Sequence, residues 1–163
     1  MNILKLELTH FGKFHLKTIT FTSGLNIVYG KNEAGKSTIH AFVRSMLFGI
    51  PDTEEGNERY SHYLPWETPH DFCGRMWIKK DDKVYRIERN FLRPQPTVRV
   101  FDDETGESLQ PAKQHLRQIL SGLTETSYLN TICIEQLKSA TDPQLAKELE
   151  DMAVNASQSK NLN

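Results

Sequence analysis

Residues 30–38 read GKNEAGKST, and this stretch decides the fold. The string has the spacing G-x-x-x-x-G-K-[ST] of a phosphate-binding P-loop. Gly30 and Gly35 let the backbone turn tightly, so that successive N–H groups face an anion. Lys36 is a compact positive charge for the outer phosphates, and the Ser37 hydroxyl is a hard oxygen ligand for Mg²⁺. The motif therefore predicts that the chain binds a nucleotide such as ATP together with Mg²⁺.

The sequence on both sides of the loop is typical of a P-loop. Residues 25–29 are mostly apolar and predict a buried strand, and residues 39–48 predict a helix. The N-terminus of that helix would carry about half a positive charge beside the phosphates. Thr38 lies one step further into the helix and is expected near the α-phosphate. The full predicted cofactor-binding set in the loop is Gly30, Asn32, Glu33, Ala34, Gly35, Lys36, Ser37 and Thr38.

Composition excludes several classes of protein. The chain has 163 residues and a net charge of −1, so no global basic field indicates nucleic-acid binding. No stretch approaches the ~20 apolar residues of a membrane span, and the N-terminus does not resemble a signal peptide. Cys73 and Cys133 are far apart and form no C-x-x-C motif. We therefore expect reduced thiols, a cytoplasmic location and no membrane partner.

Further elements follow from residue patterns along the chain. Alternation at residues 3–8 and 14–21 predicts a small antiparallel meander before the P-loop. Residues 51–72 have three prolines and no periodicity, so we expect a long, mobile and protease-sensitive loop. Strands are predicted at residues 74–78, 84–89, 97–101 and 128–134, and a helix at 111–120.

Three other features are ambiguous. Leu120-Ser121-Gly122-Leu123 imitates an LSGG signature but lacks its second glycine. His62, His70, Asp71 and Cys73 are metal-ligating residue types, but their spacing does not indicate a tetrahedral site, and scattered loop histidines are commoner. A mildly basic stretch favours a solvated face over a DNA-contact face; it consists of Arg86, Arg89, Arg93, Arg99, Lys113 and Arg117.

The loop, the meander before it and the helix ending MLFGIP resemble the N-terminal half of an ABC-type ATPase head. The resemblance covers residues 1–158 and is strongest to SMC and SbcC-type DNA-repair ATPases and to bacterial AAA-domain relatives with an NEAGKST loop. It implies an α/β fold, a P-loop NTPase of ABC type whose N-terminal lobe has a mixed sheet and an antiparallel β flap. The lobe would span residues 1–141, and residues 142–163 would begin a coiled-coil helix, with an apolar seam at Leu145, Leu149, Met152 and Ala156.

The resemblance also assigns roles to two residues outside the loop. Lys13, in the sequence FGKF, corresponds to a basic residue near the nucleotide. Gln136, in the sequence IEQ, corresponds to the Q-loop glutamine that contacts Mg²⁺ and the attacking water. Lys36 and Gln136 are therefore the expected catalytic residues, and Ser37 and Gln136 the expected metal ligands.

The sequence lacks the Asp-Glu pair and the signature that the resembled family uses for hydrolysis. We therefore expect a half-head that binds ATP without efficient turnover and needs the C-terminal half of the same head. Homodimeric head engagement, DNA contact through the full assembly and a role in double-strand-break repair or chromosome maintenance are implied by the resemblance. The alternatives are a non-catalytic nucleotide-binding interaction module and a P-loop small-molecule kinase; 29 residues before the loop argue against the kinase.

Overall fold

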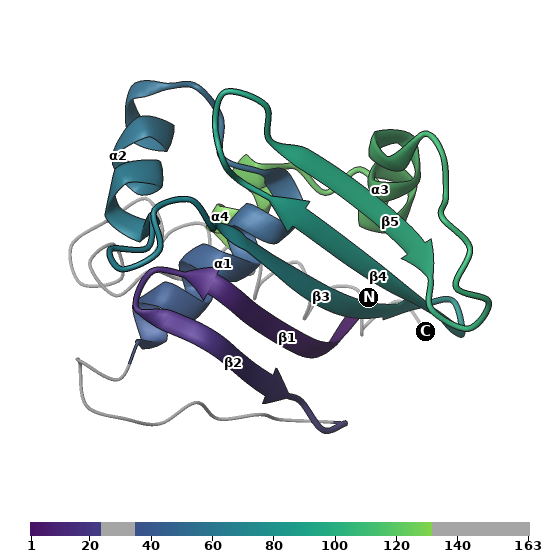
Figure 1. The fold of residues 1–163 in the computed structure, drawn as a ribbon. Coiled ribbons are helices and arrows are strands. Elements are labelled where there is room, and N and C mark those ends of the chain that lie inside the picture. The colour runs from purple at the N-terminus through teal and green to yellow at the C-terminus, as the bar shows by residue number, and fades with distance from the viewer. Residues whose placement is uncertain (24–34, 132–163) are drawn as a thin grey trace, which may run out of the picture. The chain divides into compact units, whose positions relative to one another are not determined.

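The computed structural model describes residues 1–23 and 35–131 (Figure 1). The chain divides into two compact units, residues 1–123 and 124–163. The predicted strand at 25–29, the coiled-coil start at 142–163 and the proposed boundary at residue 141 lie outside the described residues. None of the helices in the described ranges is long and apolar enough to cross a membrane.

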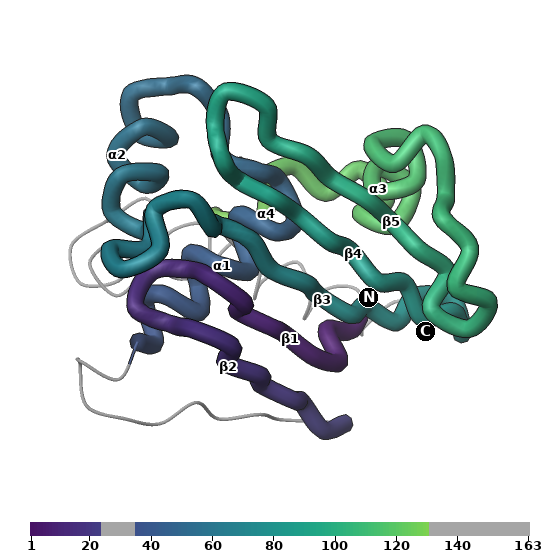
Figure 2. Tube along the Cα trace, viewed as in Figure 1, coloured from purple at the N-terminus to yellow at the C-terminus, as the bar shows by residue number. Residues whose placement is uncertain are grey.

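The first unit contains a five-stranded sheet whose described pairings are all antiparallel. The strand order is β2-β1-β3-β4-β5, so the N-terminal hairpin forms one side of the sheet (Figure 2). The meander and the strands predicted at 74–78, 84–89 and 97–101 are confirmed. The strands are β1 (Asn2–Phe11), β2 (Phe14–Thr20), β3 (Cys73–Lys80), β4 (Lys83–Asn90) and β5 (Thr97–Asp102).

Three helices accompany the sheet in the first unit: α1 (Lys36–Phe48), α2 (Glu54–Tyr63) and α3 (Ala112–Leu120). The helices predicted at 39–48 and 111–120 are confirmed. Helix α1 packs against β1, β3 and β4, and α3 packs against β5. The LSGG-like residues only end α3, because Ser121 and Gly122 adopt left-handed backbone conformations there.

The core lies between one face of the sheet and α1. Alternate strand residues are fully buried there, as the period of two requires; these are Leu6, Leu8, Met76, Ile78, Ile87 and Val100. An aromatic cluster joins the helices to the sheet. The ring of Phe11 lies 5.1 Å from Phe42, 5.3 Å from Phe72 and 5.6 Å from Phe91, measured between centroids. This cluster fixes the end of β1, just before the β1–β2 turn.

Gly74 lets α1 approach the sheet closely. A Cβ added at Gly74 would lie 2.5 Å from Phe42 Cζ and 2.9 Å from the carbonyl oxygen of Glu7. Both are shorter than any normal van der Waals contact, so the ring of Phe42 occupies the space that a side chain would need. From the sequence, Gly74 is only a glycine at the start of a strand. The requirement for glycine at this position comes from the packing of Phe42 in the tertiary structure.

We predict that Gly74→Val lowers the free energy of unfolding by about 3 kcal/mol, because overpacking forces Phe42 and α1 away from the sheet. Urea denaturation measures the effect. The double variant Gly74→Val/Phe42→Ala should lose less than the sum of the two single variants, because the smaller residue vacates the space. Strict additivity would contradict the proposed contact.

The opposite face of the sheet carries paired charges. Glu88 accepts from Arg99 at 2.9 Å and lies 3.2 Å from Arg75, and Arg86 lies 3.2 Å from Asp103. Lys5 sits over the ring of Trp77, 3.9 Å from its centroid. Arg86 and Arg99 thus have carboxylate and ring partners on this face, as a solvated face requires, whereas Arg89 lies on the other side of the sheet and bonds to α1, so the prediction is wrong for Arg89.

The expected long loop at residues 51–72 is wrong for residues 54–63, which form α2. Thr53 caps this helix by accepting from the Gly56 N–H at 3.1 Å, and two glutamates occupy its first turn. Helix α2 is largely exposed, so it needs few apolar residues to pack against the rest of the protein. Its sequence therefore lacks the helical spacing of apolar residues by which a helix is predicted. The prediction of protease sensitivity is now restricted to residues 64–71.

The strand expected at residues 128–134 is also wrong where the structure describes it. Helix α4 (Glu125–Thr131) occupies this stretch in the second unit. Thr124 caps it, accepting from the Ser127 N–H at 3.1 Å. Local capping therefore overrides the β propensity of the residues.

Candidate nucleotide-binding site

The site begins at the N-terminus of α1. Gly35 is the N-cap residue, with φ 87° and ψ 20°, a left-handed conformation that favours glycine. No side-chain cap bonds to this end of α1, and its first turn has no acidic residue. Helix α2, in contrast, has a side-chain cap at Thr53 and two glutamates in its first turn. Among the described residues, neither a capping oxygen nor a carboxylate competes for the first N–H groups of α1, which suits them to an anion.

The β1–β2 turn closes against Gly35. A Cβ added at Gly35 would lie 2.8 Å from Cε of Lys13 and would also collide with the ring of Phe14. Lys13 and Gly35 are distant in sequence, yet the fold places the lysine stem directly on the loop glycine. The role of Lys13 in binding stays a prediction.

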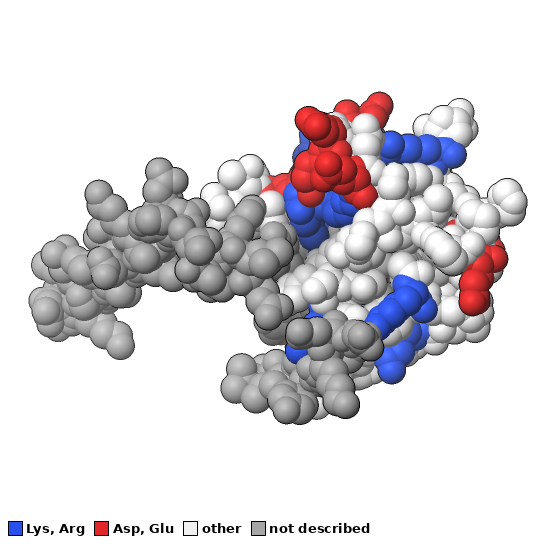
Figure 3. Space-filling model, turned by 90° about the vertical axis from the view of Figure 1, so that its left-hand side faces the viewer, with Lys and Arg blue, Asp and Glu red and all other residues white. Residues whose placement is uncertain are grey.

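Gly12 connects the turn to α1 and to α2. A Cβ added at Gly12 would lie 3.0 Å from Cγ2 of Thr38 and 3.3 Å from Cδ1 of Tyr63. The Gly12 N–H donates to the carbonyl of Tyr63 at 2.7 Å. The start of α1, the β1–β2 turn and the end of α2 thus meet at one edge of the first unit. Figure 3 views the face on the corresponding side, with Lys and Arg in blue and acidic residues in red.

The structure brings together part of the predicted site. Ser37 is exposed, Lys36 and Thr38 are half-buried, and Gly35 is buried beneath the turn. These four residues and Lys13 lie at the same end of α1. The remaining predicted residues lie outside the described ranges, and their roles stay predictions: Gly30, Asn32, Glu33, Ala34 and Gln136.

The other end of α1 is held by arginines from elsewhere in the chain. Arg89, on β4, donates to the carbonyl oxygens of Met46 at 2.7 Å and Leu47 at 3.4 Å. Arg59, on α2, donates to the carbonyl of Gly49 at 3.3 Å. The last turn of α1 has no basic residue of its own. These cations therefore satisfy the terminal carbonyls and oppose the negative end of the helix dipole.

Burial lowers the pKa of Arg89 to about 10, so its guanidinium is still charged at neutral pH. The unfolded chain holds this proton more tightly than the native chain does. The contribution of Arg89 to stability is therefore constant below pH 10 and changes only above it, where stability would rise with pH.

We predict that Arg89→Met lowers the free energy of unfolding by about 2–3 kcal/mol, because two carbonyls at the end of α1 lose a charged donor. Thermal and urea unfolding measure this. Arg99→Met is the matched control; its exposed ion pair with Glu88 contributes at most about 1 kcal/mol. Equal losses in the two variants would contradict the capping role of Arg89.

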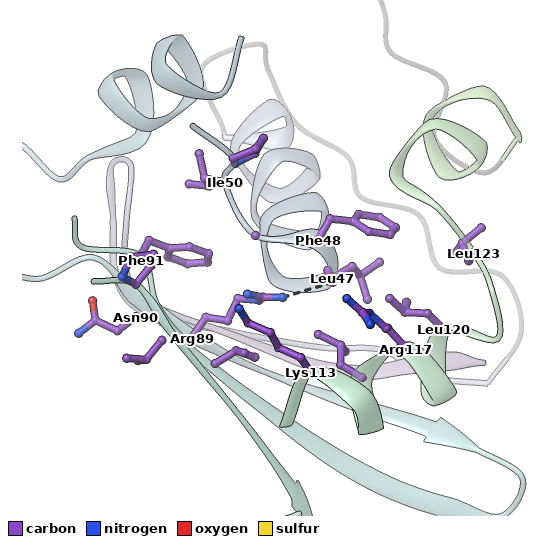
Figure 4. Close-up of a pocket in the computed structure, with 16 residues that line it drawn as sticks. Leu47, Phe48, Ile50, Arg89, Asn90, Phe91, Lys113, Arg117, Leu120 and Leu123 are labelled. Atoms are coloured by element: carbon purple, nitrogen blue, oxygen red, sulfur yellow. Dashed lines mark hydrogen bonds between the residues drawn. The ribbon is translucent and has the colours of Figure 1, made fainter. Parts of the chain in front are cut away.

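A cavity of about 410 Å³ lies near this C-terminal end of α1 (Figure 4). Lys113 and Arg117 reach into it from α3, toward the end of α1, and Arg89 bonds to Leu47 at its wall. None of the described residues that line it is Asp or Glu. The cavity is thus separate from the predicted phosphate site, which lies at the opposite end of the same helix.

The conceivable metal site finds no support in the geometry. Across the described parts of the chain, His, Cys, Asp and Glu side chains form no group of three or more that could hold a metal ion. Burial raises the pKa of the Cys73 thiol, and nearby Asp71 adds to the effect. Cys73 is therefore largely protonated at neutral pH and is a poor nucleophile.

Comparison with known proteins now adds to this geometry. The family model described as AAA domain (AAA_27) matches residues 1–153. The chain belongs to this AAA-domain family. Over 56 residues the AAA-domain chain is 43% identical to the uncharacterized protein YhaN of Bacillus subtilis (strain 168), a match that covers 34% of this chain and 6% of YhaN.

A longer match is to the DNA double-strand break repair Rad50 ATPase of Thermococcus kodakarensis. It is 26% identical over 146 residues, 83% of this chain and 15% of Rad50. The AAA-domain chain thus spans only a small part of the length of these curated relatives.

A solved structure from work on "ATP-driven dimerization and DNA stimulated activation of SMC ATPases" has the same fold. Its TM-score is 0.57 at 19% identity, and the match covers 93% of this chain and 98% of that one. The ABC-type P-loop NTPase fold predicted from the sequence is confirmed. The resemblance to SMC and SbcC-like ATPase heads is confirmed as well.

Proposed function

We propose that this AAA-domain chain is the Mg·ATP-binding part of an SMC/SbcC-like ATPase head that acts in DNA double-strand-break repair or chromosome maintenance. One observation carries the proposal: in the described part of the chain, the N-terminus of α1 begins at a left-handed Gly35 with no side-chain cap, and the turn that holds Lys13 lies against this glycine. A phosphate chain suits this arrangement in both charge and hydrogen bonding.

In this proposal the residues at the start of α1 bind and orient the nucleotide. The helix N–H groups and Lys36 hold the outer phosphates, and Thr38 lies beside the α-phosphate. Lys13 adds a second positive charge from the β1–β2 turn. Ser37, whose hydroxyl is exposed, and Gln136 would be the Mg²⁺ ligands. The ion would neutralise phosphate charge when bound.

The proposed partners follow from the relatives. Rad50 is named as a DNA double-strand break repair ATPase, and the SMC structure concerns ATP-driven dimerization and DNA-stimulated activation. By analogy, the AAA-domain chain would combine with the C-terminal half of its head, and two heads would engage around nucleotide. DNA contact would arise in the full assembly. A cytoplasmic location stays part of the proposal.

A non-catalytic nucleotide-binding module is the second candidate. The observation that favours it is the lack of an Asp-Glu pair after an apolar strand in this sequence. Both candidates bind Mg·ATP, and they differ in whether a second segment restores hydrolysis.

We predict that Ser37→Ala makes ATP binding nearly independent of Mg²⁺, because the hydroxyl is the proposed metal ligand at the start of α1. The wild-type chain should bind ATP about tenfold more tightly with Mg²⁺ than with EDTA, as measured by calorimetry. Ser37→Thr keeps the hydroxyl and should keep the Mg²⁺ effect. An undiminished Mg²⁺ effect in Ser37→Ala would exclude this residue as a ligand, and no binding by the wild-type chain would refute the proposed function.

A further inference from the structure

The cavity at the C-terminal end of α1 has no part in the proposed nucleotide site. Its volume of about 410 Å³ lies within the range of roughly 300–1,000 Å³ that is usual for small-molecule pockets. All of the described residues that line it belong to the first unit. Much of the wall is apolar, and its larger side chains are Leu47, Phe48, Phe91, Leu116, Leu120 and Leu123. The space therefore suits a small molecule with an apolar body.

Three cationic side chains also line this cavity. Lys113 and Arg117 lie one turn apart on the same face of α3, and Figure 4 shows both reaching into the cavity. Arg89 enters from β4 at the opposite wall. None of the described lining residues supplies a carboxylate to neutralise these charges. The charge of the cavity is thus complementary to an anion.

The charges of Lys113 and Arg117 are not needed to hold the two helices beside the cavity. Arg89 donates to two carbonyl oxygens in the last turn of α1, at 2.7 and 3.4 Å. Lys80 donates to two carbonyl oxygens in the last turn of α3, at 2.7 and 2.9 Å. Within residues 1–23 and 35–131, no ion pair or hydrogen bond engages the side chain of Lys113 or Arg117. Both cations are therefore available to a ligand, on helices that other residues fix in place.

We propose that this cavity binds a small organic anion. Its acidic group, a carboxylate, sulfonate or phosphate, lies between Lys113 and Arg117, and its apolar body packs against the leucine and phenylalanine wall. Hydrogen bonds from these cations to an anion are stronger than neutral ones, and burial of the apolar body adds affinity. The site lies at the opposite end of α1 from the predicted phosphate site, so this binding goes beyond the proposed function.

The test uses 8-anilinonaphthalene-1-sulfonate, an anion with an apolar ring system, as a fluorescent probe. The wild-type chain should bind it at a single site. Lys113→Gln/Arg117→Gln should weaken this binding about tenfold, because the charge-assisted hydrogen bonds to the sulfonate are lost. Both residues are exposed, so the variant should fold, and an unchanged urea midpoint checks this.

Two controls separate charge from shape. Lys17→Gln/Lys79→Gln removes two positive charges from exposed positions on β2 and β3, outside the cavity, and should change the affinity less than about twofold, because salt screens distant charges. N-Phenyl-1-naphthylamine has the same rings without the sulfonate. The wild-type chain and both double variants should bind it equally well.

Three results would overturn the proposal. The first is a wild-type chain that binds the sulfonate probe at no single site, or a cavity variant that keeps the wild-type affinity. The second is an equal loss of both probes in the cavity variant, because Lys113 and Arg117 would then shape the cavity without binding an anion. The third is displacement of the sulfonate probe by excess Mg·ATP, which would place the probe in the nucleotide site. Failure of the chain to bind ATP would refute the proposed function and leave this test intact.

Discussion

Lys36→Ala is expected to remove nearly all stabilisation of the chain by Mg·ATP. At a free concentration 100 times the Kd, a ligand that binds only the native state raises its free energy of unfolding by about 2.7 kcal/mol. The variant lacks the ammonium that reaches the outer phosphates, so the same concentration should stabilise it by less than about 0.5 kcal/mol. Thermal unfolding with and without nucleotide measures the difference. Alanine favours helix, so α1 itself should persist.

The matched control is Lys17→Ala, which removes an exposed lysine from β2 outside the loop. It changes the net charge by the same amount and should leave the nucleotide effect intact. Equal stabilisation of the wild-type chain and Lys36→Ala by Mg·ATP would show that the P-loop residues do not bind the nucleotide.

The second large effect concerns hydrolysis. Residues 1–163 alone should turn over ATP at a negligible rate, because the sequence lacks the Asp-Glu pair that the resembled family uses to orient the attacking water. Glu33 lies within the phosphate loop, and Glu135 adjoins Gln136. Adding the C-terminal half of the matching head should raise the rate by ~10³-fold or more, since lost electrostatic groups cost several kcal/mol of transition-state stabilisation. Phosphate release in single-turnover assays measures it.

Two variants control this experiment. Gln136→Ala should reduce the reconstituted rate, and Lys36→Ala should abolish it together with binding. If the chain alone hydrolyses ATP at a substantial rate that Lys36→Ala eliminates, the half-head proposal is wrong. If the chain binds ATP and the second half never restores hydrolysis, the non-catalytic module becomes the better description.

The sequence by itself determined the phosphate-loop motif and most of the strands, because these features depend on residues that are close together in the chain. The glycines and Lys36 in the loop predict nucleotide binding because a phosphate cradle needs these residue types at this spacing. Alternation predicted these strands, because β1, β3, β4 and β5 bury residues on one face of the sheet. Helix α2 was not predicted, because it buries little apolar surface and its start is defined by the cap at Thr53. Helix α4 escaped because its cap at Thr124 opposes the β propensity that follows.

Tertiary structure alone decided which distant residues surround α1. Lys13 lies against Gly35 because the β1–β2 turn, which follows the aromatic cluster on Phe11, packs on the start of α1. Arg89 satisfies the far end of α1 from β4, and Gly74 makes room for Phe42. The spacing of apolar residues along one helix or strand indicates which of its faces is buried. It does not indicate which residue of another element packs against that face, so these contacts could be found only in the tertiary structure.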